Sequence, residues 1–360
     1  MYILNFYTEL AYYTVSLYNY EKYFVSTYRK EAISMNKTKV FINGGEGTTG
    51  LRILERFAGR DDIELIPIDS ELRKDPAEVK KKINESDITF LCLPDAASIE
   101  AVSYVENPNV RIIDASTAHR TNPDWNYGFP ELSAAHREGI KNSKRVAVPG
   151  CYASGFNAIV YPLMQAGLIT ADALITCAAI SGYSGAGKKA IAQYQDADTR
   201  AIGKTTGDAH DPLCSPRQYA LAQQHKHLKE MKAVPGLTHE PIFLPQVCDY
   251  YSGMIVTIPF HKDALAKKVT LAELHEVYAK HYEGQKFVKV LALDDEQITG
   301  NFLSANTITG YDGMEVLIYG NDERMVVSTR FDNLGKGASG AAIQCMNLMI
   351  GAEEEKGLNL

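Results

Sequence analysis

The chain has 360 residues, of which 45% are hydrophobic and 22% are charged, a composition that suits two globular domains. The formal net charge of −7 argues against nucleic-acid binding, because contacts to a phosphate backbone need clustered cations. The six cysteines form no CxxC pair and no Cys/His spacing typical of zinc. We therefore expect a reducing, cytoplasmic location and no bound metal.

Residues 1–34 differ from the rest of the chain because they contain eight tyrosines. Glu9, Glu21 and Lys22 interrupt the apolar runs, so neither a signal peptide nor a membrane span is predicted. A second methionine, Met35, stands just before the first predicted strand. We expect this segment to be an upstream start or a dispensable extension rather than a functional arm.

A strand, a glycine-rich turn and a helix are predicted next. The apolar run 39–43 leads into the sequence GGEGTTG at residues 44–50, and a helical pattern follows over residues 51–57. Two sets of three glycines in this turn fit dinucleotide-binding spacings. Glycines allow a tight turn and let a pyrophosphate approach bare backbone at a helix N-terminus. The alternative is a glycine turn that binds nothing.

The second predicted strand, residues 63–68, ends at Asp69, where an NAD-binding chain places its ribose-binding carboxylate. Arg73 and Lys74 follow closely, and a cation there favours the 2′-phosphate of NADP. These residues leave the choice between NAD and NADP open. Further strands at residues 88–93 and 110–114 alternate with helical segments, which predicts a doubly wound parallel sheet.

A cysteine follows the next strand. Residues 145–148 read as a buried strand, Pro149-Gly150 ends it, and a helical pattern begins at about Cys151. A thiol at a helix N-terminus faces unpaired N–H groups and the positive end of the helix dipole, which favour the thiolate. The alternative is a buried structural cysteine.

A second glycine-rich loop follows the strand predicted at residues 173–180. Its sequence, SGYSGAGKK at residues 181–189, nearly matches a phosphate-binding loop. Lys189 stands where that motif needs a hydroxyl for magnesium, so an ATPase is not favoured. The loop is still suited to a cofactor or an acyl phosphate, and its alternative is a surface turn.

A helix is predicted from Ser215 to Met231, because Ser215-Pro216 is a strong start signal. On such a helix His225 and His227 point to different faces and do not meet. His227 and Glu230 have i,i+3 spacing, so the carboxylate is expected to orient the imidazole. The alternative for a lone helical histidine is an exposed or structurally satisfied side chain.

Together these motifs resemble the N-acetyl-γ-glutamyl-phosphate reductases of arginine biosynthesis, specifically their shorter, type 2 form. The resemblance extends over residues 37–351 and leaves residues 1–34 outside. The matching motifs lie at residues 44–50, 93–94, 114–120, 128–132, 149–152, 181–187, 225–227 and 333–340. The resemblance implies a homo-oligomeric enzyme that uses NADPH to reduce an acyl phosphate, through a thioester, to N-acetylglutamate 5-semialdehyde.

The resemblance also implies individual residue roles. Cys151 is the expected nucleophile, and His227 with Glu230 completes the catalytic set. Lys229 departs from the proline usual in the family, and His239 is the weaker candidate for the acid/base residue. The implied NADP contacts are Gly44, Gly47, Thr48, Thr49, Gly50, Arg73, Ser184, Gly185, Gly187, Asn333, Lys336 and Gly337. The expected substrate residues are Arg120, Tyr152 and Arg217, with the Arg120 guanidinium holding a phosphate or an α-carboxylate.

We predict an α/β fold with two domains. Residues 35–150 form an NADP-binding Rossmann domain, which the C-terminal helix 335–350 rejoins, and residues 151–332 form an α+β catalytic domain with a mixed sheet. Two rival hypotheses remain. One is a related acyl-phosphate reductase, either an aspartate-semialdehyde dehydrogenase or an aminoadipyl-phosphate reductase. The other is a non-catalytic NADP sensor, which would keep the glycine-rich turn but would not need Cys151, His227 and Glu230 together.

Overall fold

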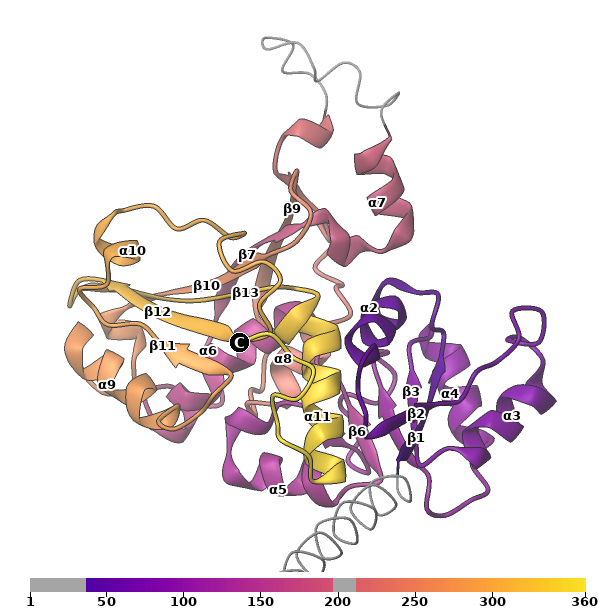
Figure 1. Cartoon of the computed structure of the whole chain (residues 1–360). Helices are drawn as coiled ribbons and strands as arrows, with labels where there is room; N and C mark the ends of the chain where they lie inside the picture. Colours follow the sequence, from indigo (N-terminus) through magenta and orange to yellow (C-terminus); the bar gives the residue numbers. More distant parts are fainter. Residues whose placement is uncertain (1–36, 197–211) are drawn as a thin grey trace, which may run out of the picture.

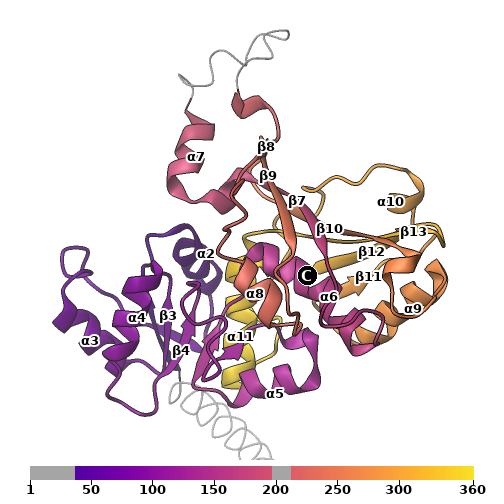
Figure 2. The same cartoon turned by 180° about the vertical axis from the view of Figure 1, so that it is seen from behind.

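The computed structural model describes residues 37–196 and 212–360, so the tyrosine-rich segment 1–34 lies outside the described residues. Two sheets lie side by side (Figures 1 and 2). The predicted fold class is confirmed, because one sheet is entirely parallel and the other is mixed. Within the described ranges, no helix is both long enough and apolar enough to cross a membrane.

The first sheet has the strand order β2-β1-β3-β4-β6-β5, and all its neighbouring strands are parallel. Buried apolar side chains of these short strands form the domain core. Its strands are β1 (Thr38–Asn43), β2 (Ile63–Leu65), β3 (Ile88–Leu91), β4 (Arg111–Asp114), β5 (Asn126–Tyr127) and β6 (Arg145–Ala147). Its helices are α2 (Thr48–Phe57), α3 (Pro76–Glu85), α4 (Asp95–Ser103), α5 (Ala134–Asn142) and the short η1 (Pro130–Leu132).

The glycine-rich turn between β1 and α2 needs glycine at two positions for different reasons. Gly44 has a φ of +87°, and a Cβ there would lie 2.4 Å from the Cys92 carbonyl oxygen. A Cβ on Gly50 would lie 2.6 Å from the Gly44 carbonyl oxygen. Side chains at either position would push the turn open, so the evenly spaced set Gly44, Gly47 and Gly50 describes this turn.

The second sheet is mixed and has the strand order β11-β12-β13-β10-β7-β9-β8. Its pairs β7/β9 and β11/β12 are parallel and the other four are antiparallel. Its strands are β7 (Thr176–Gly182), β8 (Arg217–Gln218), β9 (Ile242–Cys248), β10 (Met254–His261), β11 (Val288–Val290), β12 (Met314–Gly320) and β13 (Arg324–Phe331). The remaining short elements are η2 (Tyr183–Ala186), α7 (Lys188–Gln195), η4 (Pro212–Cys214), η5 (Lys262–Ala264), α9 (Leu271–His281) and α10 (Glu296–Thr299).

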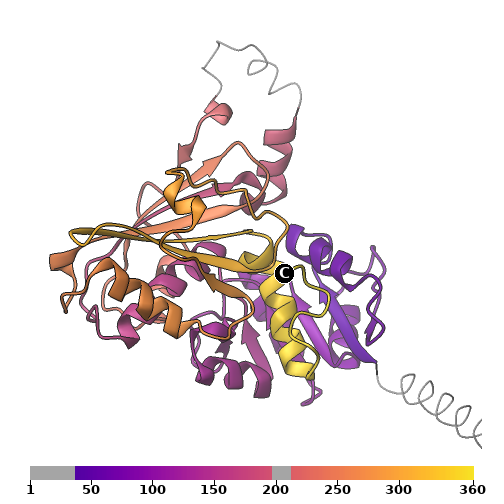
Figure 3. The ribbon, with the colours of Figure 1, turned by 60° about the vertical axis from the view of Figure 1, so that its left-hand side comes forward.

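Helix α6 (Cys151–Gln165) connects the two sheets and packs against β10 and β13. A Cβ on Gly155 would lie 2.6 Å from both Val256 and Thr329 side-chain atoms, so the glycine permits this close packing. The chain returns through a π-helical turn, η6 (Gly335–Ser339), into α11 (Gly340–Ile350). Figure 3 shows α11 at the junction of the two sheets, where it shares a core with strands of the parallel sheet.

The helix predicted from Ser215 to Met231 is wrong up to His227. Arg217 and Gln218 form strand β8 beside β9, turns follow, and the helix is only α8 (Leu228–Ala233). The Gln223 side chain accounts for this, because its amide donates to the Phe243 carbonyl at 2.8 Å and accepts from the Phe243 N–H at 2.9 Å. Gln223 and Ala220 adopt φ values of 55° and 53°. Pairing with β9 therefore overrides the local helix signal.

Candidate active site

A cavity of about 310 Å³ lies where the two sheets meet, and segments from both domains line it. The parallel sheet contributes the turn before α2 and the ends of β3 and β6. The other half of the chain contributes the start of α6, the η2 loop, residues 219–227 and the turn before η6. The cavity thus gathers the glycine-rich turn, the cysteine and the histidines that the sequence analysis singled out.

Cys151 lines this cavity as the first residue of α6, with Gly150 at the N-cap. Burial raises the pKa of Cys151 to about 11, although the Arg120 charge and the Tyr152 N–H oppose this shift. The predicted preference for the thiolate is therefore wrong, because desolvation outweighs the helix terminus. The thiol needs a base to become a nucleophile.

His227 lies beside the cysteine turn, because a Cβ on Gly150 would come within 2.3 Å of its Nε2 atom. The ring is buried, and no hydrogen bond reaches its Nδ1 atom from the described residues. Burial, with the Arg120 charge, lowers the pKa of His227 well below its usual value. The imidazole is therefore neutral at pH 7, so one ring nitrogen has a lone pair for a proton, while the lowered pKa makes the ring a weaker base than a free histidine.

The predicted separation of His225 and His227 is wrong. Their ring centroids are 4.7 Å apart in an edge-to-face arrangement, and both rings line the cavity. They meet because a turn, rather than a helix, precedes α8, and His227 stands at the N-cap of that helix. Burial lowers the pKa of His225 to about 4, so this ring is also neutral at pH 7.

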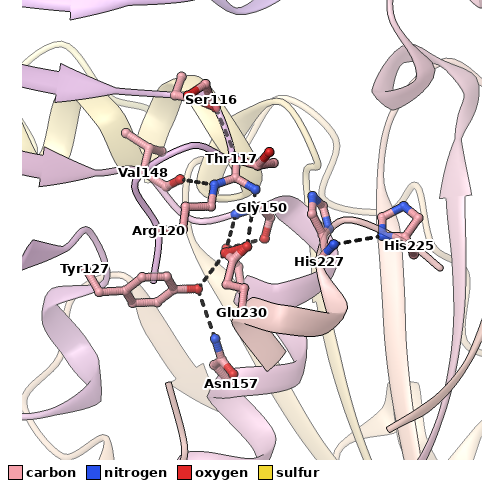
Figure 4. A network of polar contacts seen from close by, with 12 residues as sticks. Ser116, Thr117, Arg120, Tyr127, Val148, Gly150, Asn157, His225, His227 and Glu230 are labelled. Atoms are coloured by element: carbon pink, nitrogen blue, oxygen red, sulfur yellow. Dashed lines mark hydrogen bonds and ion pairs between the residues drawn. The ribbon is translucent and has the colours of Figure 1, made fainter. Parts of the chain in front are cut away.

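Glu230 does not orient His227 as predicted. Its Oε1 atom accepts hydrogen bonds from the Gly150 N–H at 2.7 Å and the Tyr127 hydroxyl at 2.9 Å, and its Oε2 atom accepts from Arg120 at 3.2 Å (Figure 4). Burial raises the pKa of Glu230, and the nearby Arg120 charge opposes that shift. Glu230 is thus a positioning residue for the turn that precedes Cys151.

The three expected substrate residues lie in different surroundings. Arg120 faces the cavity, yet its Nε atom donates to the Val148 carbonyl at 2.8 Å and its Nη2 atom to the Ala115 carbonyl at 3.0 Å. Tyr152 also lines the cavity and packs against the Phe243 ring. Arg217 is not among the lining residues.

Arg217 is engaged elsewhere. Its Nε atom donates to the Tyr194 hydroxyl at 3.2 Å, and its guanidinium lies over the Tyr194 ring, 5.3 Å from the centroid. This position does not support the expected contact with substrate, because β8 directs the side chain toward α7.

Most of the expected dinucleotide residues do line the cavity. These are Gly47, Thr48, Thr49, Ser184, Gly185, Gly187, Asn333 and Gly337. Asn333 is held in place, because its amide donates to the Ser184 hydroxyl at 3.0 Å and accepts from the Gly253 N–H at 2.9 Å. Gly44 lines the adjoining second cavity, and Gly50 shapes the turn itself. The cradle is built from backbone and small side chains, as a pyrophosphate requires.

A second cavity, of about 590 Å³, adjoins the first and shares Gly47, Cys92 and Leu93 with it. This second cavity is lined by Ser70, Arg73 and Lys74, together with apolar residues of β2 and of the segment that follows β2. The Arg73 guanidinium forms an ion pair with the Glu46 carboxylate.

Asp69 is not among the lining residues of this second cavity, and its carboxylate accepts from the Glu71 N–H at 3.0 Å. Asp69, the acid that favoured NAD in the sequence analysis, thus forms a hydrogen bond within its own turn. The cations Arg73 and Lys74 remain on the cavity wall.

Lys336 is placed differently from the expectation. Its ammonium is buried and donates to both Glu131 carboxylate oxygens at 2.8 Å, and it lies 4.8 Å from the Phe129 ring centroid. This ion pair joins the π-helical turn to η1. The position does not support a contact between Lys336 and a dinucleotide.

Three further residues of the site were not singled out from the sequence. Tyr127 bonds Glu230, and Tyr219 and Lys226 line the cavity. Tyr127 immediately precedes the motif at residues 128–132, and Lys226 stands between the two histidines, so proximity to a motif was the available signal.

His239 is exposed and does not line the cavity. Among the described residues no cluster of histidine, cysteine and acidic side chains is suited to a metal ion.

Comparison with known proteins places this site in a family. Residues 62–142 match the family described as "Semialdehyde dehydrogenase, NAD binding domain", and residues 151–333 match "Semialdehyde dehydrogenase, dimerisation domain". The N-acetyl-gamma-glutamyl-phosphate reductase 2 of Nostoc sp. is 44% identical over 328 residues, which cover 90% of this chain and 100% of that protein. The chain belongs to the N-acetyl-γ-glutamyl-phosphate reductase family.

Other members of the reductase family are nearly as similar. The N-acetyl-gamma-glutamyl-phosphate reductase of Burkholderia lata is 42% identical and covers 89% of this chain and 98% of its own length. Among solved structures, aspartate semialdehyde dehydrogenase II of Vibrio cholerae, complexed with ASA, has a TM-score of 0.66 at 15% identity and covers 88% of this chain and 99% of that one. That similarity shows the shared fold. The two family matches and the reductase relatives show that the chain is an enzyme of the semialdehyde dehydrogenase type with a nicotinamide-dinucleotide-binding domain.

Proposed function

We propose that the protein is an NADPH-dependent reductase that converts N-acetyl-γ-glutamyl phosphate to N-acetylglutamate 5-semialdehyde and phosphate in arginine biosynthesis. The observation that carries this proposal is one cavity that joins the Cys151 thiol, the neutral His227 imidazole and the glycine-rich turn. The 44% identical Nostoc protein and the 42% identical Burkholderia protein, both named as reductases of this substrate, favour this acyl phosphate over related ones.

In the first step His227 accepts the Cys151 proton, and the resulting thiolate attacks the acyl carbon of the substrate. A C–S bond forms and the C–O bond to the phosphate breaks, which leaves a thioester on Cys151. His227 passes its proton to the departing phosphate oxygen. The first N–H groups of α6, at the residue that carries the thiol, would stabilise the negative charge that develops on the acyl oxygen.

The residues present fit a nicotinamide dinucleotide, because the turn at residues 44–50 has no room for side chains at Gly44 and Gly50 and two adjoining cavities meet at Gly47. Thr48, Thr49 and the Ser184–Gly187 loop would hold it. When bound, the reduced cofactor would supply the hydride for the thioester carbon. Cys151 would then leave as the thiolate when the C–S bond breaks and the aldehyde is released, and it would regain a proton from solvent.

NADP is the proposed cofactor, because Arg73 and Lys74 line the second cavity whereas Asp69 does not. Cations there pair with a 2′-phosphate, which NAD lacks. We also propose a homo-oligomer, which the match to a dimerisation domain supports. A cytoplasmic location is proposed because the six cysteines form no CxxC pair and no spacing typical of a disulfide framework, as expected in a reducing compartment.

The test is the reverse reaction, in which NADPH formation is followed with N-acetylglutamate semialdehyde, phosphate and NADP⁺. Aspartate semialdehyde serves as the matched control substrate. Phosphate-dependent reduction of NADP⁺ with the acetylated substrate alone supports the proposal. Activity with the control alone would assign a different acyl phosphate, and no activity with either would favour an NADP sensor or a carrier-linked substrate.

A further inference from the structure

Two basic side chains, Arg120 and Lys226, line the active-site cavity, and they differ in what they already contact. The Arg120 side chain is only 8% exposed. Its guanidinium donates to two backbone carbonyls and to Glu230, so three of its donors are already used within the protein. Arg120 therefore supports the wall of the cavity and has few donors left for an incoming anion.

Lys226 has the opposite surroundings. It is exposed at the cavity, and none of the described residues forms a hydrogen bond or ion pair with its ammonium. It lines the same cavity as Cys151, His225 and His227, and its charge acts to lower the pKa of each of them. All three ammonium donors are available to a ligand.

The segment that carries Lys226 is held in a defined place. Gln223 fixes it to β9 through the paired hydrogen bonds with Phe243. The rings of His225 and His227, the residues before and after Lys226 in the sequence, pack against each other. Lys226 also acts to lower the pKa of Asp95, with which it forms no ion pair. The Asp95 carboxylate is itself engaged by the Thr117 N–H at 2.9 Å and by the Thr117 hydroxyl. The ammonium is thus positioned at the cavity without being neutralised by a contact.

We propose that Lys226 binds the phosphoryl group of the acyl phosphate, and inorganic phosphate in the reverse direction. This inference rests on the proposed function. A phosphate that leaves from, or attacks, the acyl group on Cys151 must lie beside the sulfur, where Lys226 is the cation with free donors. In the reverse direction a phosphate oxygen bonds to the thioester carbon, the C–S bond breaks and the thiolate leaves, while Lys226 keeps its proton and neutralises phosphate charge.

The test compares Lys226→Met with Lys229→Met in the reverse reaction of the full chain. Lys229 is exposed on α8 but does not line the cavity, so it is the matched control for loss of one positive charge. The KM for inorganic phosphate and the KM for N-acetylglutamate semialdehyde are measured separately, because the semialdehyde carries the competing anion, a carboxylate. NADP⁺ binding and urea denaturation report whether each variant keeps its fold.

We expect Lys226→Met to raise the KM for phosphate by about 10- to 100-fold, the effect of losing a hydrogen bond between two charged groups. Lys226→Arg should restore much of the loss, and Lys229→Met should change neither KM by more than about twofold. A rise confined to the semialdehyde KM would assign Lys226 to the carboxylate and overturn the proposal, as would an equal effect of both methionine variants. A wild-type protein without phosphate-dependent activity would instead refute the proposed function.

Discussion

The Glu230→Gln substitution tests the hydrogen-bond network behind the cysteine. The Glu230 carboxylate is 2% exposed, and its two oxygens accept three hydrogen bonds, from the Gly150 N–H, the Tyr127 hydroxyl and Arg120. An amide has only one acceptor oxygen. In either orientation of the amide its NH₂ group therefore faces a donor, and Arg120 loses the negative charge that compensates its own.

The size of the effect follows from burial. A hydrogen bond to a charged group contributes about 1.5–3 kcal/mol, and a buried ion pair that loses one partner costs about 3–5 kcal/mol. Arg120 is almost as buried as Glu230, so solvent screening reduces these values little. We expect the free energy of unfolding to fall by about 3 kcal/mol. The rate should fall by roughly 10- to 100-fold, since Gly150 directly precedes Cys151 and small misplacements are costly.

Urea denaturation measures the stability loss, and Tyr127→Phe is the control that removes a single hydroxyl from the same network. That control should lose only about 1 kcal/mol. The pH profile of the rate separates the two roles considered for Glu230. If Glu230 only positions the turn, the substitution leaves the apparent pKa of His227 in the pH–rate profile unchanged. If Glu230 orients the imidazole, the substitution shifts that apparent pKa. A variant as stable as the wild type, or a shifted apparent pKa of His227, would refute the reasoning.

Four further predictions concern the site. Cys151→Ser should abolish turnover while NADPH binding, measured by fluorescence titration, stays within a few-fold. His227→Asn should lower the rate by roughly 10²–10⁴, whereas the same change at the exposed His239 should not; the reverse result would reassign the base. Because burial raises the pKa of Cys151 to about 11, its alkylation by iodoacetamide without substrate should accelerate with pH up to about that value, and a plateau near neutral pH would contradict the burial argument. Lys336→Met, which strands the buried Glu131 charge, should cost about 3 kcal/mol of stability in urea, yet leave the KM for NADPH unchanged; a large rise in that KM would restore the cofactor role.

Local patterns were sufficient for the features that depend on neighbouring residues. The apolar runs became β1, β3, β4 and β6, and Pro149-Gly150 ended a strand just before α6, as predicted. The glycine-rich turn also formed between a strand and a helix. Each of these features depends on side chains a few positions apart in the sequence. Apolar periodicity and the backbone restrictions of proline and glycine are therefore enough to predict them.

The roles of single polar side chains depended on partners that are distant in the sequence. Glu230 bonds groups 80, 103 and 110 residues away, so its i,i+3 relation to His227 was misleading. Gln223 pairs with β9 and replaces a predicted helix by a turn, which brings the two histidines together.

Burial decided the protonation states as well. It leaves Cys151 a thiol where the helix terminus alone predicts a thiolate. Hydrogen-bond partners and desolvation are set by which surfaces meet in the folded chain. A linear pattern therefore identifies the reacting residues but leaves their partners and charges to tertiary packing.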